Sequence, residues 1–126
     1  MARVLLYNFS DDVRRKKVKA LLFRLAVPSR EIPPEEQDHP LGYLLGLDGY
    51  GAAEKSGEAP FTGEMLVMHG LSSRQFQGLL DGMRQAGVYV PLKAAATPYN
   101  LSWSSLRLQR ELQEEHRMMQ DIKKQN

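Results

Sequence analysis

Two segments of the chain are almost continuously apolar and predict the central strands of a sheet. They cover residues 3–9 and 64–69 and contain β-branched or aromatic side chains that favour extended backbone. Runs of this kind are typical of strands that are buried on both faces. Each run is followed by a turn, a serine that can cap a helix (Ser10 and Ser72), and apolar residues at helical spacing. The hydrophobic pattern therefore predicts two strand–helix units.

A second, weaker strand is expected after each helix. The first covers residues 27–32 and is short and polar, and the second covers residues 88–92 and contains Pro91. Proline cannot donate to a β-ladder, and short polar strands are typical of sheet edges. The order strand, helix, strand, strand, helix, strand predicts an α+β protein with a ferredoxin-like βαββαβ antiparallel sheet.

The remaining elements are a breaker-rich middle segment and a long helix at the C-terminus. Pro40 is expected to open a short helix that carries leucines on one side. Residues 102–124 contain no helix breaker and predict one long helix that begins at Ser102. We expect a single domain over residues 1–126. Its parts are a first βα unit (1–32), a proline- and glycine-rich middle segment (33–63), a second βα unit (64–95) and the C-terminal helix (102–124).

The apolar character of the central strands on both sides has a consequence for assembly. A ferredoxin-like sheet carries its two helices on one face and leaves the other face open. We therefore expect the C-terminal helix, a second subunit, or both to cover the opposite face. This expectation favours a non-catalytic interaction module that forms a homodimer or binds another protein.

Composition narrows the class of protein further. The chain has 126 residues, of which 42% are hydrophobic and 25% charged, a formal net charge of +2 and no cysteine. The absence of cysteine excludes disulfides, thiolate metal sites and a cysteine nucleophile. The apolar run at the N-terminus is too short for a signal peptide, and no apolar run is long enough to span a membrane. We expect a cytoplasmic protein that does not bind membranes.

The residues from Gly87 to Leu112 resemble a known bacterial family. The resemblance rests on the string Pro91-Leu-Lys-Ala-Ala-Ala-Thr-Pro-Tyr-Asn100 and on Trp103 that follows it. The turn Met68-His-Gly-Leu-Ser72 and, more loosely, the segment Pro40-Leu-Gly-Tyr-Leu-Leu-Gly46 are similar to the same family. The family is domain-of-unknown-function family 3783. The resemblance implies a small uncharacterised bacterial domain and no particular reaction.

Five residues form a candidate site for a small ligand or an anion. Lys93, Thr97, Asn100 and Trp103 form the densest run of specific side chains, where an edge strand ends and the last helix begins. In a ferredoxin-like sheet, the start of the first strand and the end of the third lie at one end and would add two basic groups. The alternative is that this run only shapes a turn and anchors a helix. The candidate ligand-binding residues are Arg3, His69, Lys93, Thr97 and Asn100.

A basic first helix offers nucleic-acid binding as another alternative. Phosphate neutralisation by lysine and arginine is the general source of nucleic-acid affinity. The central strands, however, lack the aromatic pattern with which RNA-binding sheets stack bases, and a basic helix face is commonly just solvated. The candidate residues are Arg14, Arg15, Lys16, Lys17 and Lys19.

The sequence contains no strong motif for catalysis or for a cofactor. The three histidines lie far apart and lack metal-ligand spacing. No glycine-rich phosphate loop, catalytic triad order or dinucleotide fingerprint is present. We therefore assign no catalytic residue, no metal site and no cofactor, and the pattern disfavours an enzyme without excluding one.

Overall fold

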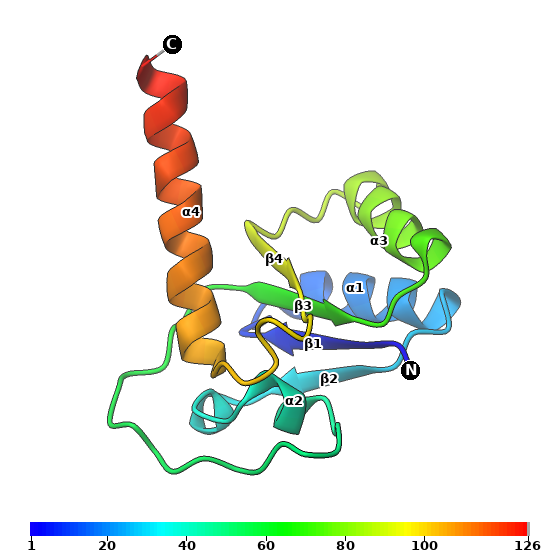
Figure 1. The fold of residues 1–126 in the computed structure, drawn as a ribbon. Helices are drawn as coiled ribbons and strands as arrows, with labels where there is room; N and C mark the ends of the chain where they lie inside the picture. The colour runs from blue at the N-terminus through cyan, green and yellow to red at the C-terminus, as the bar shows by residue number, and fades with distance from the viewer. Residues whose placement is uncertain (126) are drawn as a thin grey trace.

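The computed structural model describes residues 1–125, so Asn126 of the predicted domain lies outside the described residues. One sheet separates two layers of helices (Figure 1). In chain order the elements are β1 (Arg3–Tyr7), α1 (Asp12–Arg24), β2 (Ser29–Ile32), the 3-10 helix η1 (Pro34–Glu36), α2 (Leu41–Leu44), β3 (Met65–His69), α3 (Ser73–Gln85), β4 (Leu92–Ala95) and α4 (Ser105–Gln125). The predicted α+β class and the long C-terminal helix are confirmed.

The sheet is mixed, and its strand order is β2-β1-β3-β4. Strands β1 and β3 are antiparallel at the centre, with Leu5 opposite Val67, as the apolar runs predicted. The prediction of an antiparallel ferredoxin-like sheet is wrong, because β2 lies beside β1 rather than beside β3 and both outer pairs are parallel. A hairpin would have placed β2 beside β3, but residues 33–64 form a long connection instead. Helix α1 therefore connects β1 to β2, and α3 connects β3 to β4, each as a direct βαβ crossover between adjacent strands.

Strand β4 begins later than the sequence predicted. Residues 88–91 belong to no strand, with a bend at Pro91, and the ladder with β3 starts at Leu92. Pro91 has no N–H to donate, so pairing becomes regular only beyond it. Val88 and Val90 are nevertheless buried, which explains the strand-like hydrophobic pattern of this segment.

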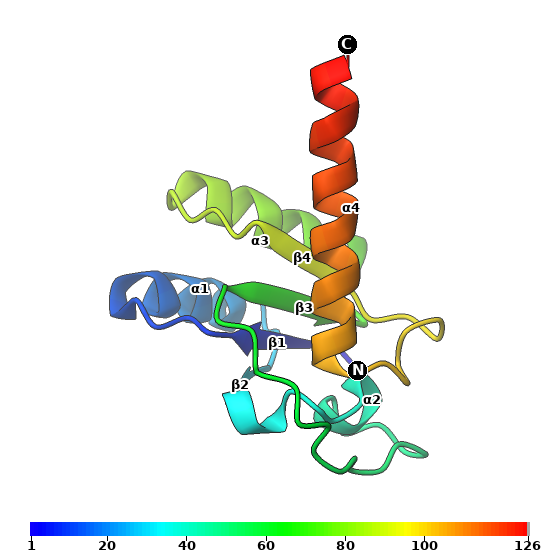
Figure 2. The same ribbon diagram turned by 90° about the vertical axis from the view of Figure 1, so that its left-hand side faces the viewer.

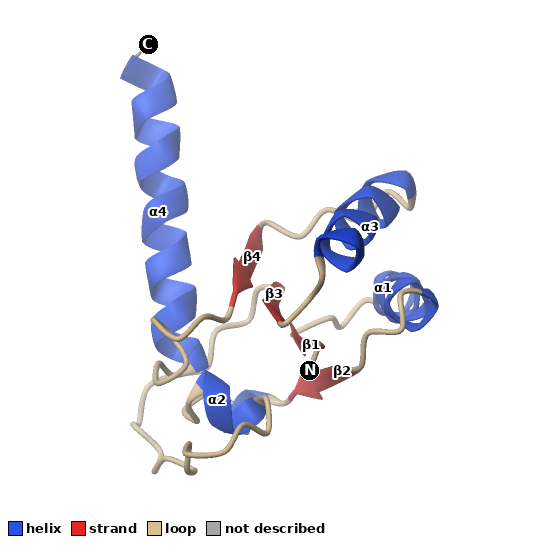
Figure 3. Ribbon diagram, turned by 45° about the vertical axis from the view of Figure 1, so that its right-hand side comes forward, coloured by secondary structure: helices blue, strands red, loops and turns tan. Residues whose placement is uncertain are grey.

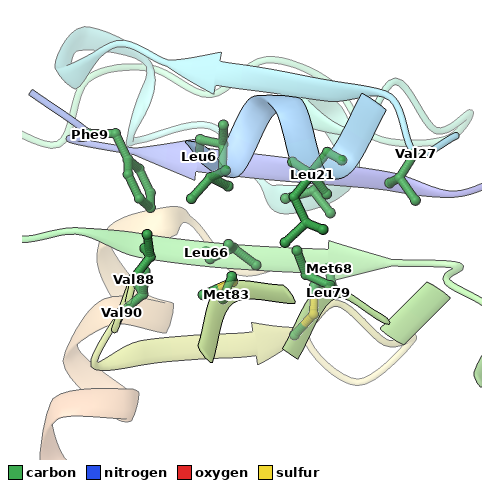
Figure 4. Close-up of a cluster of buried hydrophobic side chains, with 13 residues drawn as sticks. Leu6, Phe9, Leu21, Val27, Leu66, Met68, Leu79, Met83, Val88 and Val90 are labelled. Carbon is green, nitrogen blue, oxygen red and sulfur yellow. The ribbon is translucent and has the colours of Figure 1, made fainter. Parts of the chain in front are cut away.

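Helices α1 and α3 cover one face of the sheet. Their apolar residues form a core with side chains of β1 and β3, as Figure 4 shows for Leu6, Leu66 and Leu79. Two glycines of α3 allow the close approach of α1, because a Cβ on Gly82 would lie 2.5 Å from Leu21 Cδ1. The packing of α1 against α3 therefore requires very small residues at these two positions of α3.

The opposite face of the sheet is covered by the chain itself. Figure 3 shows α2 and the beginning of α4 on the side away from α1 and α3. Leu5 and Tyr7 of β1 pack there against Leu41 of α2 and Leu108 of α4. The expectation that the C-terminal helix helps to cover this face is confirmed. Because the cover is intramolecular, the apolar sheet by itself gives no reason for a second subunit.

Three helices are capped by a polar side chain, and two of these caps lie one or two residues later than the sequence predicted. Asp11, rather than Ser10, caps α1 through its side-chain oxygen. Ser104, rather than Ser102, accepts a hydrogen bond from a first-turn amide of α4 at 3.1 Å. The capping box that begins at Ser72 is present as the pattern predicted. These caps satisfy backbone N–H groups that a helix start leaves unpaired.

Helix α4 leaves the body of the molecule halfway along its length. Leu106 and Leu108 are buried and Leu112 is half-buried, whereas residues 113–124 are all exposed. Figures 1 and 2, which differ by a quarter turn, both show the helix rising away from the sheet toward the C-terminus. Within residues 1–125, no helix combines the length and the apolar character that crossing a membrane requires.

Candidate functional site

The projecting half of α4 carries the most concentrated exposed apolar surface of the helix. Met118, Met119 and Ile122 are 52%, 56% and 51% exposed. Leu112, Met119 and Ile122 are separated by seven and three residues, so they lie on one face of the helix. Together with buried Leu108, they follow the four–three spacing of a helix that pairs with another helix.

This apolar face adjoins a hollow at the edge of the sheet. The hollow has a volume of about 230 Å³ and lies between α4 and the beginning of β4. A second hollow, of about 450 Å³, continues along α4 and shares lining residues with the first. We call this surface the helix groove and define it by five residues of the first hollow: Pro91, Leu92, Leu112, His116 and Met119.

The charges of α4 are divided along its length. Acidic Glu111, Glu114 and Glu115 precede the exposed apolar residues, and Lys123 and Lys124 follow them. Arg117 lies between the two groups and forms ion pairs with Glu114 and with Asp121, the latter at 3.2 Å. The hydrogen bond from Arg117 holds the pKa of Glu114 below its usual value. One end of the exposed segment is therefore acidic and the other basic.

The structure brings together part of the predicted ligand site and separates Lys93 from it. Arg3 lies opposite His69 in the β1–β3 register, at the predicted end of the sheet. Lys93 lies instead near the start of β4, opposite Leu66. Its Nζ donates a hydrogen bond to the Val90 carbonyl at 2.6 Å. The five candidate residues thus do not form one pocket.

The side chain of Asn100 and the backbone of Thr97 are hydrogen-bonded to each other within a local turn. Asn100 is buried, and its Oδ1 accepts a hydrogen bond from the Thr97 amide at 2.9 Å. Its Nδ2 donates to the Ala95 carbonyl at 3.1 Å. Trp103 is half-buried beside this turn, with the Arg107 guanidinium 4.0 Å from its ring centre. The geometry favours the turn-shaping alternative, and ligand binding at these residues stays a prediction.

The five candidate basic residues of α1 each contact an acceptor of the chain. Arg14 makes a two-point contact with Glu64, with Nε–Oε2 and Nη2–Oε1 distances of 3.0 and 2.6 Å. This hydrogen bonding raises the pKa of Arg14. The other contacts join Arg15 and Lys16 to Asp12, Lys17 to the Ala86 carbonyl, and Lys19 to Glu31. A phosphate would compete with these partners, so nucleic-acid binding stays an unsupported alternative.

The helix groove is a feature that the sequence-based reasoning missed. The spacing of Leu108, Leu112, Met119 and Ile122 was visible in the sequence, but only the fold places Pro91 and Leu92 beside it. Among residues 1–125, no three histidine, aspartate or glutamate side chains gather in a way that could hold a metal ion.

Comparison with known proteins gives a family for the second half of the chain. Residues 64–119 match the family model described as Domain of unknown function (DUF3783). The matched segment contains β3, α3, β4 and α4 as far as Met119. A search of curated proteins found no match to the chain. The family inferred from the Pro91–Asn100 string is therefore confirmed for residues 64–119, the segment that matches the DUF3783 model.

Proposed function

We propose that the chain is a self-associating interaction module, in which α4 pairs in antiparallel fashion with α4 of a second copy. The observation that carries the proposal is the projecting half of α4, with its exposed apolar face and divided charges. A helical segment as short as this projecting half is only marginally stable in water by itself. Packing of an apolar face is the usual source of stability for such a segment. A second copy supplies that packing.

The proposed register follows from the sequence of the helix. Antiparallel alignment about Arg117 places Leu112 of one copy opposite Ile122 of the other. The same alignment places Glu111 level with Lys123, an attractive pair at both ends of the contact. It also places Arg110 level with Lys124, and Glu58 of the same chain, which pairs with Arg110 at 2.7 Å, offsets that repulsion. Because the pairing is symmetric, every contact occurs twice, as expected for a two-fold dimer.

The helix groove extends the contact beyond the helix pair. Leu112 lines the groove together with Pro91 and Leu92, so Ile122 of the second copy reaches all three residues. The family match supports this surface, since it continues past the point where α4 leaves the body. Glu115 lies opposite Met119 in the middle of the proposed interface, and this charged residue on an apolar face limits the affinity of the dimer. We expect a dissociation constant on the order of micromolar.

Sedimentation equilibrium over about a hundredfold range of concentration around that value tests the proposal. The wild-type chain is expected to change from monomer to dimer. The substitution Ile122→Glu adds a charge to the apolar face and is expected to weaken the dimer at least about tenfold. A matched control is Phe23→Glu on α1, where the side chain is 86% exposed, and it is expected to dimerise like the wild type.

A charge exchange tests the register separately. Lys123→Glu is expected to weaken the dimer, because it places two acidic residues opposite each other. Adding Glu111→Lys restores the opposite pair and is expected to restore the affinity. A wild-type chain that stays monomeric over the whole range, or a Phe23→Glu chain that dissociates like Ile122→Glu, would contradict the proposal.

A further inference from the structure

A third hollow lies on the other side of the β4 edge, at the end of α3. Its volume is about 400 Å³, within the range of small-molecule pockets. The walls are formed by apolar side chains of α3 and of the loop before β4, namely Leu80, Met83, Val88 and Tyr89. It shares only Lys93 with the two hollows that border α4, so it is distinct from the proposed dimer contact.

Basic side chains surround this apolar hollow. Lys93 and Arg84 belong to its lining. Lys93 Nζ lies 5.2 Å from the ring centre of Tyr89 and uses one of its three donors on the Val90 carbonyl. The ammonium group is thus held at the hollow with donors left for a ligand oxygen.

Two bases of α1 are bonded to backbone at or next to the lining residues Gly87 and Tyr89. Lys17 donates to the Ala86 carbonyl at 3.1 Å, and Arg14 donates to the Tyr89 carbonyl at 2.7 Å. The acidic partners of this group are Asp81, paired with Arg84 at 2.7 Å, and Glu64, paired with Arg14. Four bases against two acids leave an excess of positive charge around an apolar interior.

We propose that this hollow binds a small amphipathic carboxylate, with its apolar body between α3 and Tyr89 and its carboxylate on Lys93. A charged head matches the basic rim, and a ring or branched chain matches the apolar walls. Met83 in the wall favours an aromatic body, because methionine sulfur makes favourable contacts with rings. This site was absent from the sequence-based prediction, which grouped Lys93 with residues at the other end of β4.

Titration calorimetry of the full chain tests the site with three acids: 2-naphthoate, indole-3-acetate and octanoate. Each is compared with the neutral alcohol of the same carbon skeleton. At least one acid is expected to bind with saturation, about tenfold or more tightly than its alcohol. Absence of saturable binding by all three acids, or equal affinity for acid and alcohol, would overturn the proposal.

Two variants assign the binding to this hollow. Lys93→Gln is expected to abolish the preference for the acid over the alcohol, and Leu80→Trp is expected to block both by filling the space. Lys16→Gln on α1 removes the same charge from an exposed residue and is the matched control. Since Leu80 also supports the packing of α3, Lys93→Gln is the deciding variant. An unchanged acid preference in Lys93→Gln would refute the assignment.

Discussion

A single buried hydrogen bond joins the first strand to the last helix. Tyr7 and Ser105 are both 0% exposed, and their hydroxyl oxygens lie 2.6 Å apart. The two residues are 98 positions apart in the sequence, so the bond ties the start of α4 to the centre of the sheet. We expect it to be a measurable source of stability for the packed half of α4.

The magnitude follows from what each substitution leaves behind. Tyr7→Phe leaves the Ser105 hydroxyl buried without its partner, and Ser105→Ala leaves the Tyr7 hydroxyl in the same state. Each single change is expected to lower the free energy of unfolding by about 2 kcal/mol. The double variant removes both hydroxyls and is expected to lose about 2 kcal/mol as well, rather than the sum of the two.

Urea denaturation measures these free energies, with fluorescence of the single tryptophan, Trp103, as the signal. The protein concentration is kept low and constant, because a dimer would add stability that depends on concentration. A double variant whose loss equals the sum of the two single losses would refute the proposed coupling.

The same pair predicts a dependence on pH. Burial raises the pKa of Tyr7 well above its usual value, and the Ser105 hydrogen bond and the Arg30 charge oppose this only in part. The unfolded chain releases the tyrosine proton near pH 10, whereas the folded protein retains it. This contribution to stability is therefore present below about pH 10 and is lost as the pH rises further, by up to about 1.4 kcal/mol per pH unit. The stability difference between the wild type and Tyr7→Phe should shrink above about pH 10, and a constant difference would contradict the reasoning.

Two further substitutions test local packing by the same urea measurement. Asn100→Ala removes two hydrogen bonds to backbone and is expected to cost about 2 kcal/mol, whereas Thr97→Ala at the neighbouring exposed position costs less than about 0.5 kcal/mol. Equal losses would show that the turn does not depend on the Asn100 amide. Gly82→Ala is expected to destabilise by about 1 kcal/mol, because crowding against buried Leu21 outweighs the gain in helix propensity. A more stable Gly82→Ala variant would show that α1 and α3 can separate without cost.

Several elements could be predicted because their causes lie within a few neighbouring residues. The two central strands follow from runs that are apolar on both sides, and the capping box at Ser72 follows from a spacing of three residues. The short α2 helix follows from Pro40 and its leucines. The family resemblance likewise rested on a local string, which the match over residues 64–119 confirmed.

The strand order and the candidate sites depend on contacts between residues far apart. Strands of similar hydrophobicity can pair in several orders, and the long connection over residues 33–64 selects the direct crossover of β2 to β1. The sequence left open whether the bases of α1 are solvated or bind phosphate, and folding places Glu64 and Glu31 beside two of them. Lys93 and Asn100 belong to the same predicted ligand site. In the structure, the Asn100 side chain bonds the local backbone after β4, whereas Lys93 lies near the start of β4 and bonds the Val90 carbonyl.

The sequence by itself thus determined the α+β class, the strands at the centre of the sheet, the long final helix and the family that residues 64–119 match. Only the tertiary structure decided the order of the strands, the intramolecular cover of the second face, and the two surfaces at the β4 edge. The physical reason is that hydrophobic periodicity reports whether a side chain is buried, but not which distant segment buries it. For α4, the same periodicity covers a buried half and an exposed half, and only the fold shows where one becomes the other.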